Sequence, residues 1–127
     1  MKRTTRQREA IREVFHEQSR PLGPEEVLRF ARRKVPRIGL ATVYRNLKSL
    51  AETGWLVSVD LPGKSALYEM AGKKHHHYFH CRGCDRCYEV YACSEDVRNL
   101  VPRGYVLEGH ELILYGVCPA CAKQKGK

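Results

Sequence analysis

The chain has 127 residues and a formal net charge of +9, which is enough sequence for one ordinary domain or two small ones. The basic start MKRTTRQREA is followed by no apolar run, so the sequence predicts neither a secretory signal nor a membrane span. We therefore expect a cytoplasmic protein without membrane contact. In that compartment its six cysteines should bind metal or stay reduced rather than form structural disulfides.

The positive charge is concentrated in the first half of the chain. Residues 1–64 carry 14 Lys and Arg against 7 Asp and Glu, whereas residues 65–127 carry 9 against 7. The first half is therefore suited to a polyanion such as DNA, although a generally basic, soluble surface explains the charge equally well.

Apolar periodicity in the first half predicts three helices, within residues 4–18, 23–36 and 39–54. Pro24 suits the first turn of the second helix, and Pro36 is expected to stop it. The third helix should turn an apolar side inward and a polar, cationic side outward. The outward residues are Thr42, Tyr44, Arg45, Asn46, Lys48 and Ser49.

After the third helix, apolar residues recur at every second position, which predicts a β-hairpin. The residues that alternate along its two strands are Trp55, Val57, Val59 and Leu61, then Ala66, Tyr68 and Met70. Three helices followed by a hairpin indicate a winged helix-turn-helix, whose third helix is short enough to enter a DNA major groove. The alternative is a helical bundle whose third helix merely has a solvated face.

The second half predicts a small α/β module behind a hinge at residues 70–77. Residues 85–93 and 104–118 are strand-like, and a short helix capped by Ser94 is expected between them. The predicted fold class is therefore α+β, with a winged-helix domain and hinge over residues 1–72 and an α/β domain over residues 73–127.

Four of the cysteines form two knuckles, Cys81-x-x-Cys84 and Cys118-x-x-Cys121. Four thiolates at these spacings suit a closed, tetrahedral and therefore structural zinc site, which would stabilise a module with little core. Redox-active dithiols or ordinary free cysteines are the alternatives. Cys87 and Cys93 are left over, and Cys87 could be a core residue, an oxidant-reactive thiol or a soft ligand in a second site.

A second metal site is suggested by the stretch HHHYFHCRGCDRC. In an extended segment its histidines fall on two sides, with His75 and His77 together, while His110 and the acidic Asp96 or Glu95 follow later in the chain. Imidazole and carboxylate ligands suit a divalent transition metal. A histidine-rich loop that binds metal only adventitiously is the alternative.

The chain resembles the ferric uptake regulator (Fur) family of bacterial metal- and peroxide-responsive repressors. The resemblance rests on GLATVYRNL in the third helix, Tyr68-Glu69, the histidines before Cys81-x-x-Cys84, Glu89, and HELILYGVCPAC near the end. It implies a homodimer in which the winged helix is joined by a hinge to a dimerisation domain.

The same resemblance implies functional residues. Tyr44 and Arg45 would face the DNA and Arg3 would reach toward the minor groove, with Thr42 and Lys48 beside them. Structural zinc would be held by Cys81, Cys84, Cys118 and Cys121. A metal site of the dimerisation domain would use His75, His77, Asp96 and His110.

The hinge site, which serves relatives as the regulatory sensor, is matched only by Glu69, His76 and Glu89. Pro21 and Tyr78 stand where relatives have histidines. Either His80 or Cys87 substitutes, or the site has another selectivity, or it is lost.

We therefore expect a metal-dependent, homodimeric repressor. A second divalent metal (Fe, Mn or Zn) would orient two winged helices on a palindromic, AT-rich DNA operator. The alternative is a DNA-binding protein with structural zinc only and no metal sensing. No enzymatic activity is expected, because the clearest metal site is closed and no H-E-x-x-H, G-x-S-x-G or phosphate-binding glycine loop occurs.

Overall fold

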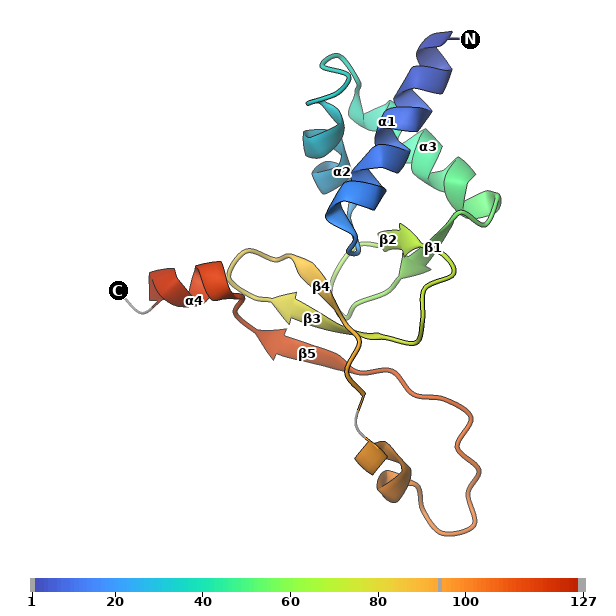
Figure 1. Cartoon of the computed structure of the whole chain (residues 1–127), viewed down its shortest axis with the longest axis vertical. Coiled ribbons are helices and arrows are strands. Elements are labelled where there is room, and N and C mark those ends of the chain that lie inside the picture. Colours follow the sequence, from blue (N-terminus) through green and yellow to red (C-terminus); the bar gives the residue numbers. More distant parts are fainter. Residues whose placement is uncertain (1, 94, 126–127) are drawn as a thin grey trace. The chain divides into compact units, whose positions relative to one another are not determined.

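The computed structural model describes residues 2–93 and 95–125, with the side chains of residues 5–93 and 96–124. The chain divides into two compact units, Met1–Gly72 and Lys73–Lys127 (Figure 1). Helices and sheets occur together, which confirms the α+β class. Within the described residues, every helix is too short or too polar to span a lipid bilayer.

Three helices form most of the first unit: α1 (Lys2–Gln18), α2 (Pro24–Ala31) and α3 (Leu40–Glu52). They pack around one apolar core to which α1 contributes Ile11, Val14 and Phe15. The helix α2 ends earlier than Pro36, because the backbone amides of residues 33 and 34 turn back to the carbonyls of residues 30 and 31. The three predicted helices are confirmed, and the end of α2 is the boundary that moves most.

The polar side of α3 is narrower than the periodicity predicts. Val43, Leu47 and Leu50 are buried as expected, but Asn46 is also buried, with 8% of its surface exposed. Its Nδ2 atom donates to the Thr42 carbonyl at 2.9 Å, so a short amide bonded to its own helix sits between the apolar rows. The prediction that Asn46 faces outward is therefore wrong.

The hairpin consists of β1 (Leu56–Val59) and β2 (Leu67–Met70), paired antiparallel. On its other side β2 is bridged to Leu22, since the backbone groups of Leu22 and Tyr68 exchange hydrogen bonds of 2.8 and 2.9 Å. The predicted alternation is wrong in β1, where Leu56 is buried and Val57 is 42% exposed. Both ends of this four-residue strand pack on the core, so its burial does not follow a simple period of two.

The second unit contains a three-stranded sheet in the order β4-β3-β5. Its strands are β3 (His77–Cys81), β4 (Cys87–Val90) and β5 (Ile113–Gly116). A 3-10 helix, η1 (Glu95–Leu100), follows β4, and α4 (Pro119–Lys125), which the sequence pattern did not predict, follows β5. The predicted cap Ser94 lies outside the described residues, and only the last part of residues 104–118 forms a strand.

Strand directions bring distant parts of the sequence together at each end of this sheet. The strand β3 is antiparallel to β4 and parallel to β5. Its first residue, His77, therefore lies beside the end of β4 and the start of β5, whereas its last residue, Cys81, pairs with Gly116 at the end of β5. Two groups of candidate metal ligands consequently lie at opposite ends of one small sheet, whose strands β3, β4 and β5 are labelled in Figure 1.

Candidate functional site

The four knuckle cysteines meet at one end of the sheet. The Sγ atoms of Cys81, Cys84, Cys118 and Cys121 all lie within 4.8 Å of one another. The Sγ atoms of Cys84 and Cys118 are 3.9 Å apart, close to the ~3.8 Å edge that Zn–S bonds of about 2.3 Å give in a tetrahedron. Sulfur fills all four corners, so the chemistry of this donor set fits structural zinc with no open position.

Backbone amides make this group of thiols suitable for a cation. The N–H groups of Cys84 and Cys118 donate to the Cys81 Sγ atom at 3.4 and 3.2 Å. Burial disfavours the Cys81 thiolate, but these two amides, a side-chain hydrogen bond with Cys84 and the amide of Gly83 together outweigh it and lower the pKa of Cys81 to about 6. The knuckle is thus arranged for the deprotonated sulfur that zinc requires.

Close packing explains the glycine in the first knuckle. A Cβ atom at Gly83 would lie 2.8 Å from both the Cβ and the Sγ atoms of Cys121. The next residue but one, Asp85, has a φ of 66° and its amide donates to the Cys81 carbonyl at 2.8 Å. The first knuckle therefore turns tightly enough for the second knuckle to lie directly against it.

A second group of ligand atoms lies at the other end of the sheet. The Nε2 atoms of His75, His77 and His110 are separated by 3.1, 3.3 and 3.1 Å. The fourth member is the Sγ atom of Cys93, at 3.7, 3.4 and 3.2 Å from the same three nitrogens. The structure thus brings together three of the four predicted ligands of this site, with Cys93 beside them.

Asp96, the fourth predicted ligand, lies outside this group. It lines a cavity of about 730 Å³ together with His75, Cys93 and His110. Its role as a ligand stays a prediction. The sequence pattern predicts no role for Cys93, because the spacing between Cys93 and His110 matches no short motif. Only the pairing of the strands shows that the two are neighbours.

His77 is the most enclosed member of the group, with 1% of its surface exposed. Burial lowers the pKa of His77, and the adjacent His75 and His110 rings lower it further. A neutral imidazole is the form that binds metal. The environment of His77 therefore favours the ligand form of its ring.

The predicted hinge ligands belong to different units. Glu69 is a buried residue of β2 in the first unit, whereas His76 and Glu89 belong to the second. A shared site of these three residues stays a prediction. The suggested substitutes are engaged elsewhere: His80 Nε2 lies 2.6 Å from Asp85 Oδ1, and Cys87 is buried on β4.

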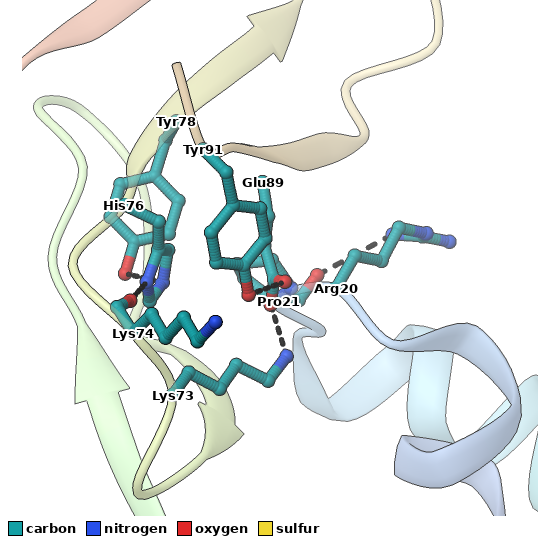
Figure 2. Close-up of polar contacts among 8 residues, drawn as sticks. All are labelled: Arg20, Pro21, Lys73, Lys74, His76, Tyr78, Glu89 and Tyr91. Carbon is teal, nitrogen blue, oxygen red and sulfur yellow. Dashed lines mark hydrogen bonds and ion pairs between the residues drawn. The ribbon is translucent and has the colours of Figure 1, made fainter. Parts of the chain in front are cut away.

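Within the second unit, His76 and Glu89 already have polar partners (Figure 2). The Lys73 ammonium group pairs with Glu89 Oε2, and the Tyr91 hydroxyl donates to Glu89 Oε1 at 2.9 Å. His76 Nε2 lies 3.1 Å from the Tyr78 hydroxyl. The negative charge of Glu89 is thus balanced by a lysine of the chain itself.

Of the five predicted DNA-binding residues, three lie on the solvent side of α3. Tyr44 is 54% exposed, and Arg45 and Lys48 are exposed as well. Thr42 is half-buried and its Oγ1 accepts a hydrogen bond from Arg45 Nη2 at 3.0 Å. Arg3 belongs to α1, but its side chain lies outside the described residues.

The chain is similar to known proteins of one family over most of its length. Residues 1–115 match the ferric uptake regulator family. The chain is 32% identical to the ferric uptake regulation protein of Campylobacter jejuni, over 97% of this chain and 82% of that protein. It is 27% identical to the peroxide operon regulator of Bacillus subtilis, over 97% and 86%. A solved structure of a zinc-bound manganese uptake regulator superposes with a TM-score of 0.76 at 26% identity, covering 88% of this chain and 87% of that one.

Proposed function

The chain belongs to the ferric uptake regulator family of metal-responsive transcription regulators, and we propose that it acts as a homodimeric, metal-dependent repressor that binds a palindromic DNA operator. Membership of this family supports a regulatory rather than an enzymatic role. The observation that carries the proposal is that α3 has one buried apolar side and one exposed side with aromatic and cationic residues. The assignment of DNA contacts to Tyr44, Arg45 and Lys48 rests on it.

One side of α3 is anchored and the other is free for DNA. Val43, Leu47 and Leu50 are buried in the core, and Ser49 Oγ accepts a hydrogen bond of 3.1 Å from Arg8 of α1. These contacts hold the helix while its exposed aromatic and cationic side chains remain available. A helix presented in this way beside a β-hairpin has the features of a major-groove reader.

Self-association is supported by apolar surface on the second unit. Leu100, Tyr105 and Val106 are 79%, 72% and 83% exposed, and β5 forms one edge of the sheet. Large exposed apolar side chains and an unpaired strand edge are each suited to covering by a protein surface. We assign that surface to a second copy of the chain, since a palindromic operator requires a symmetric dimer.

The two groups of ligands would divide the metal chemistry. The four cysteines would hold zinc as a structural cross-link between the β3–β4 turn and the chain after β5. The group around His77 would hold the second metal, which supplies a positive charge that links the segments before β3, after β4 and before β5. A coupling of about 1–3 kcal/mol between metal and DNA would change operator affinity about 5- to 150-fold.

Operator binding by variants of α3 tests the proposal. Double-stranded sequences selected from a random pool would be titrated with the metal-loaded protein and followed by fluorescence anisotropy. Tyr44→Ala and Arg45→Ala should each weaken binding by about 1–3 kcal/mol. Lys123→Ala, which removes one exposed positive charge from α4, is the matched control and should leave affinity nearly unchanged. Unchanged affinity for both α3 variants would refute the assignment.

A second candidate function keeps the DNA binding but has structural zinc only and no metal sensing. It is favoured by the pairing of Lys73 with Glu89, which neutralises a predicted ligand without metal. Operator titration with and without added Mn²⁺, Fe²⁺ or Zn²⁺ separates the two candidates. Affinity that is independent of all three metals, in protein that retains its structural zinc, would support this second function.

A further inference from the structure

The group around His77, which consists of His75, His77, Cys93 and His110, also indicates which metal it would bind. We propose that Cys93 is the fourth ligand of this site, and that the site is a closed, tetrahedral centre of three imidazoles and one thiolate, selective for zinc over manganese. The inference deepens the proposed function and rests on its claim of a second metal. It replaces the predicted carboxylate ligand Asp96 with a thiolate.

The six distances among the four ligand atoms fit a tetrahedron. Zinc bonds of about 2.05 Å to nitrogen and 2.3 Å to sulfur give N–N edges of about 3.3 Å and N–S edges of about 3.5 Å. The three N–N separations are 3.1 to 3.3 Å, and the N–S separations are 3.2 to 3.7 Å. The pairs that include sulfur are the longer ones on average, as the longer Zn–S bond requires.

The same distances do not fit an octahedral metal. Any four corners of an octahedron include one opposite pair, and opposite ligands on bonds near 2 Å are at least about 4 Å apart. The longest separation here is 3.7 Å, between Cys93 Sγ and His75 Nε2. All four atoms can therefore bind one ion only in tetrahedral coordination, which is the geometry that zinc commonly adopts in proteins.

The environment of His77 is an independent indication of a ligand. This side chain is almost fully buried, and its Nδ1 atom is a buried polar atom without a hydrogen-bond partner. Burying an imidazole whose Nδ1 has no partner is unfavourable unless another interaction offsets it. The Nε2 atom faces the three other ligand atoms at 3.1 to 3.4 Å, so a metal bond at Nε2 would offset the cost of burying this ring, although it would not satisfy Nδ1 itself.

The donor atoms favour the same metal. Thiolate and imidazole are soft or borderline ligands that suit zinc, whereas manganese prefers oxygen ligands. Asp96 would provide such an oxygen, but it lies on the wall of the neighbouring cavity rather than among the converging atoms. Selectivity for zinc therefore depends on Cys93, and the two residues can be tested against each other.

Cobalt substitution of the full chain tests this inference without DNA. Mild chelation would empty the second site while mass spectrometry verifies that zinc, which has no visible absorption, still fills the four-cysteine site. Added Co²⁺ should then give the intense visible bands of four-coordinate cobalt and a near-ultraviolet thiolate-to-cobalt band. Zinc should displace the cobalt, and a large excess of Mn²⁺ should not.

Three variants complete the test. Cys93→Ser should abolish the thiolate band and weaken zinc binding by at least about 10- to 100-fold. Mutating a residue that only hydrogen-bonds to a metal ligand already reduces affinity by this factor. Asp96→Asn, the matched control, should keep both the spectrum and the affinity. Cys93→Asp should bind cobalt without the thiolate band and shift preference toward Mn²⁺. A weak six-coordinate spectrum that Asp96→Asn removes would overturn the inference, as would a wild-type protein that binds no second metal.

Failure of this inference differs visibly from failure of the proposed function. Operator titrations of the same samples would show whether metal changes DNA affinity. Metal-dependent DNA binding without a thiolate band refutes the thiolate-containing site and leaves the repressor proposal standing. The reverse result, a four-coordinate thiolate spectrum with metal-independent DNA binding, supports the site and refutes metal-dependent repression.

Discussion

The backbone N–H of Cys118 donates to the Sγ atom of Cys81 at 3.2 Å, although 37 positions separate the two residues. One knuckle therefore holds part of the other in place before any metal bond is counted. The β3–β5 pairing, in which Cys81 is opposite Gly116, brings the two knuckles within reach. The zinc site and the small sheet thus support each other.

Gly83→Ala should damage this zinc site without removing a ligand. The added methyl group would lie 2.8 Å from both the Cβ and Sγ atoms of Cys121, so one knuckle would have to move away from the other. We expect zinc affinity to fall by at least about tenfold, measured by competition with a chromogenic chelator. Gly39→Ala is the matched control, because no atom lies within 4 Å of a Cβ there. Equal zinc affinity in both variants would contradict the packing argument.

Leu47→Ala and Lys48→Ala should separate stability from DNA recognition on α3. Leu47 is 1% exposed, so its truncation should lower the free energy of unfolding by about 2–5 kcal/mol. Lys48 is exposed, and its loss should change that free energy by less than about 0.5 kcal/mol while weakening operator binding. Urea unfolding followed by the fluorescence of Trp55, which packs against the core, measures the first effect. A large loss of stability in Lys48→Ala would be inconsistent with its exposed position.

Lys73→Met should destabilise the second unit. The Lys73 and Glu89 side chains are only 14% and 6% exposed, so removing the ammonium leaves a buried carboxylate supported by the Tyr91 hydroxyl. The expected loss is about 3–5 kcal/mol, and Lys73→Met combined with Glu89→Gln should recover most of it. Hydrogen exchange of the β3 and β4 amides localises the effect. If the double variant is no more stable than the single one, the pair does not stabilise this unit.

Val106→Glu should weaken the proposed homodimer. The side chain is 83% exposed in the single chain, so the substitution should leave each chain folded. In a dimer that covers this surface, an unpaired buried charge costs more than about 1.4 kcal/mol, which raises the dissociation constant more than about tenfold. Sedimentation equilibrium measures the change, and Arg103→Gln, an exposed polar neighbour, serves as the control. An unaltered dimer would place the interface elsewhere.

The local features of this protein could be predicted from the sequence. The apolar spacing of α1 and α3 repeats over several turns, so each helix is specified by residues close to one another in the chain. The cysteine knuckles are equally local, because two ligands separated by two residues meet in a single turn. For the histidine group the sequence predicts His75, His77 and His110, which the structure brings together, but the sequence pattern places Asp96 rather than Cys93 beside them.

Tertiary packing decided the rest. Asn46 and Val57 have burial opposite to that of their sequence pattern, because a short amide can bond to its own helix and a four-residue strand can pack both ends on the core. Cys93 joins His77 and His110 because β4 runs antiparallel and β5 parallel to β3. The sequence by itself determined which residues can bind metal or DNA. Which of these residues lie close enough to bind the same metal depends on strand pairing between distant segments. The spacing of residues along the sequence does not predict that pairing.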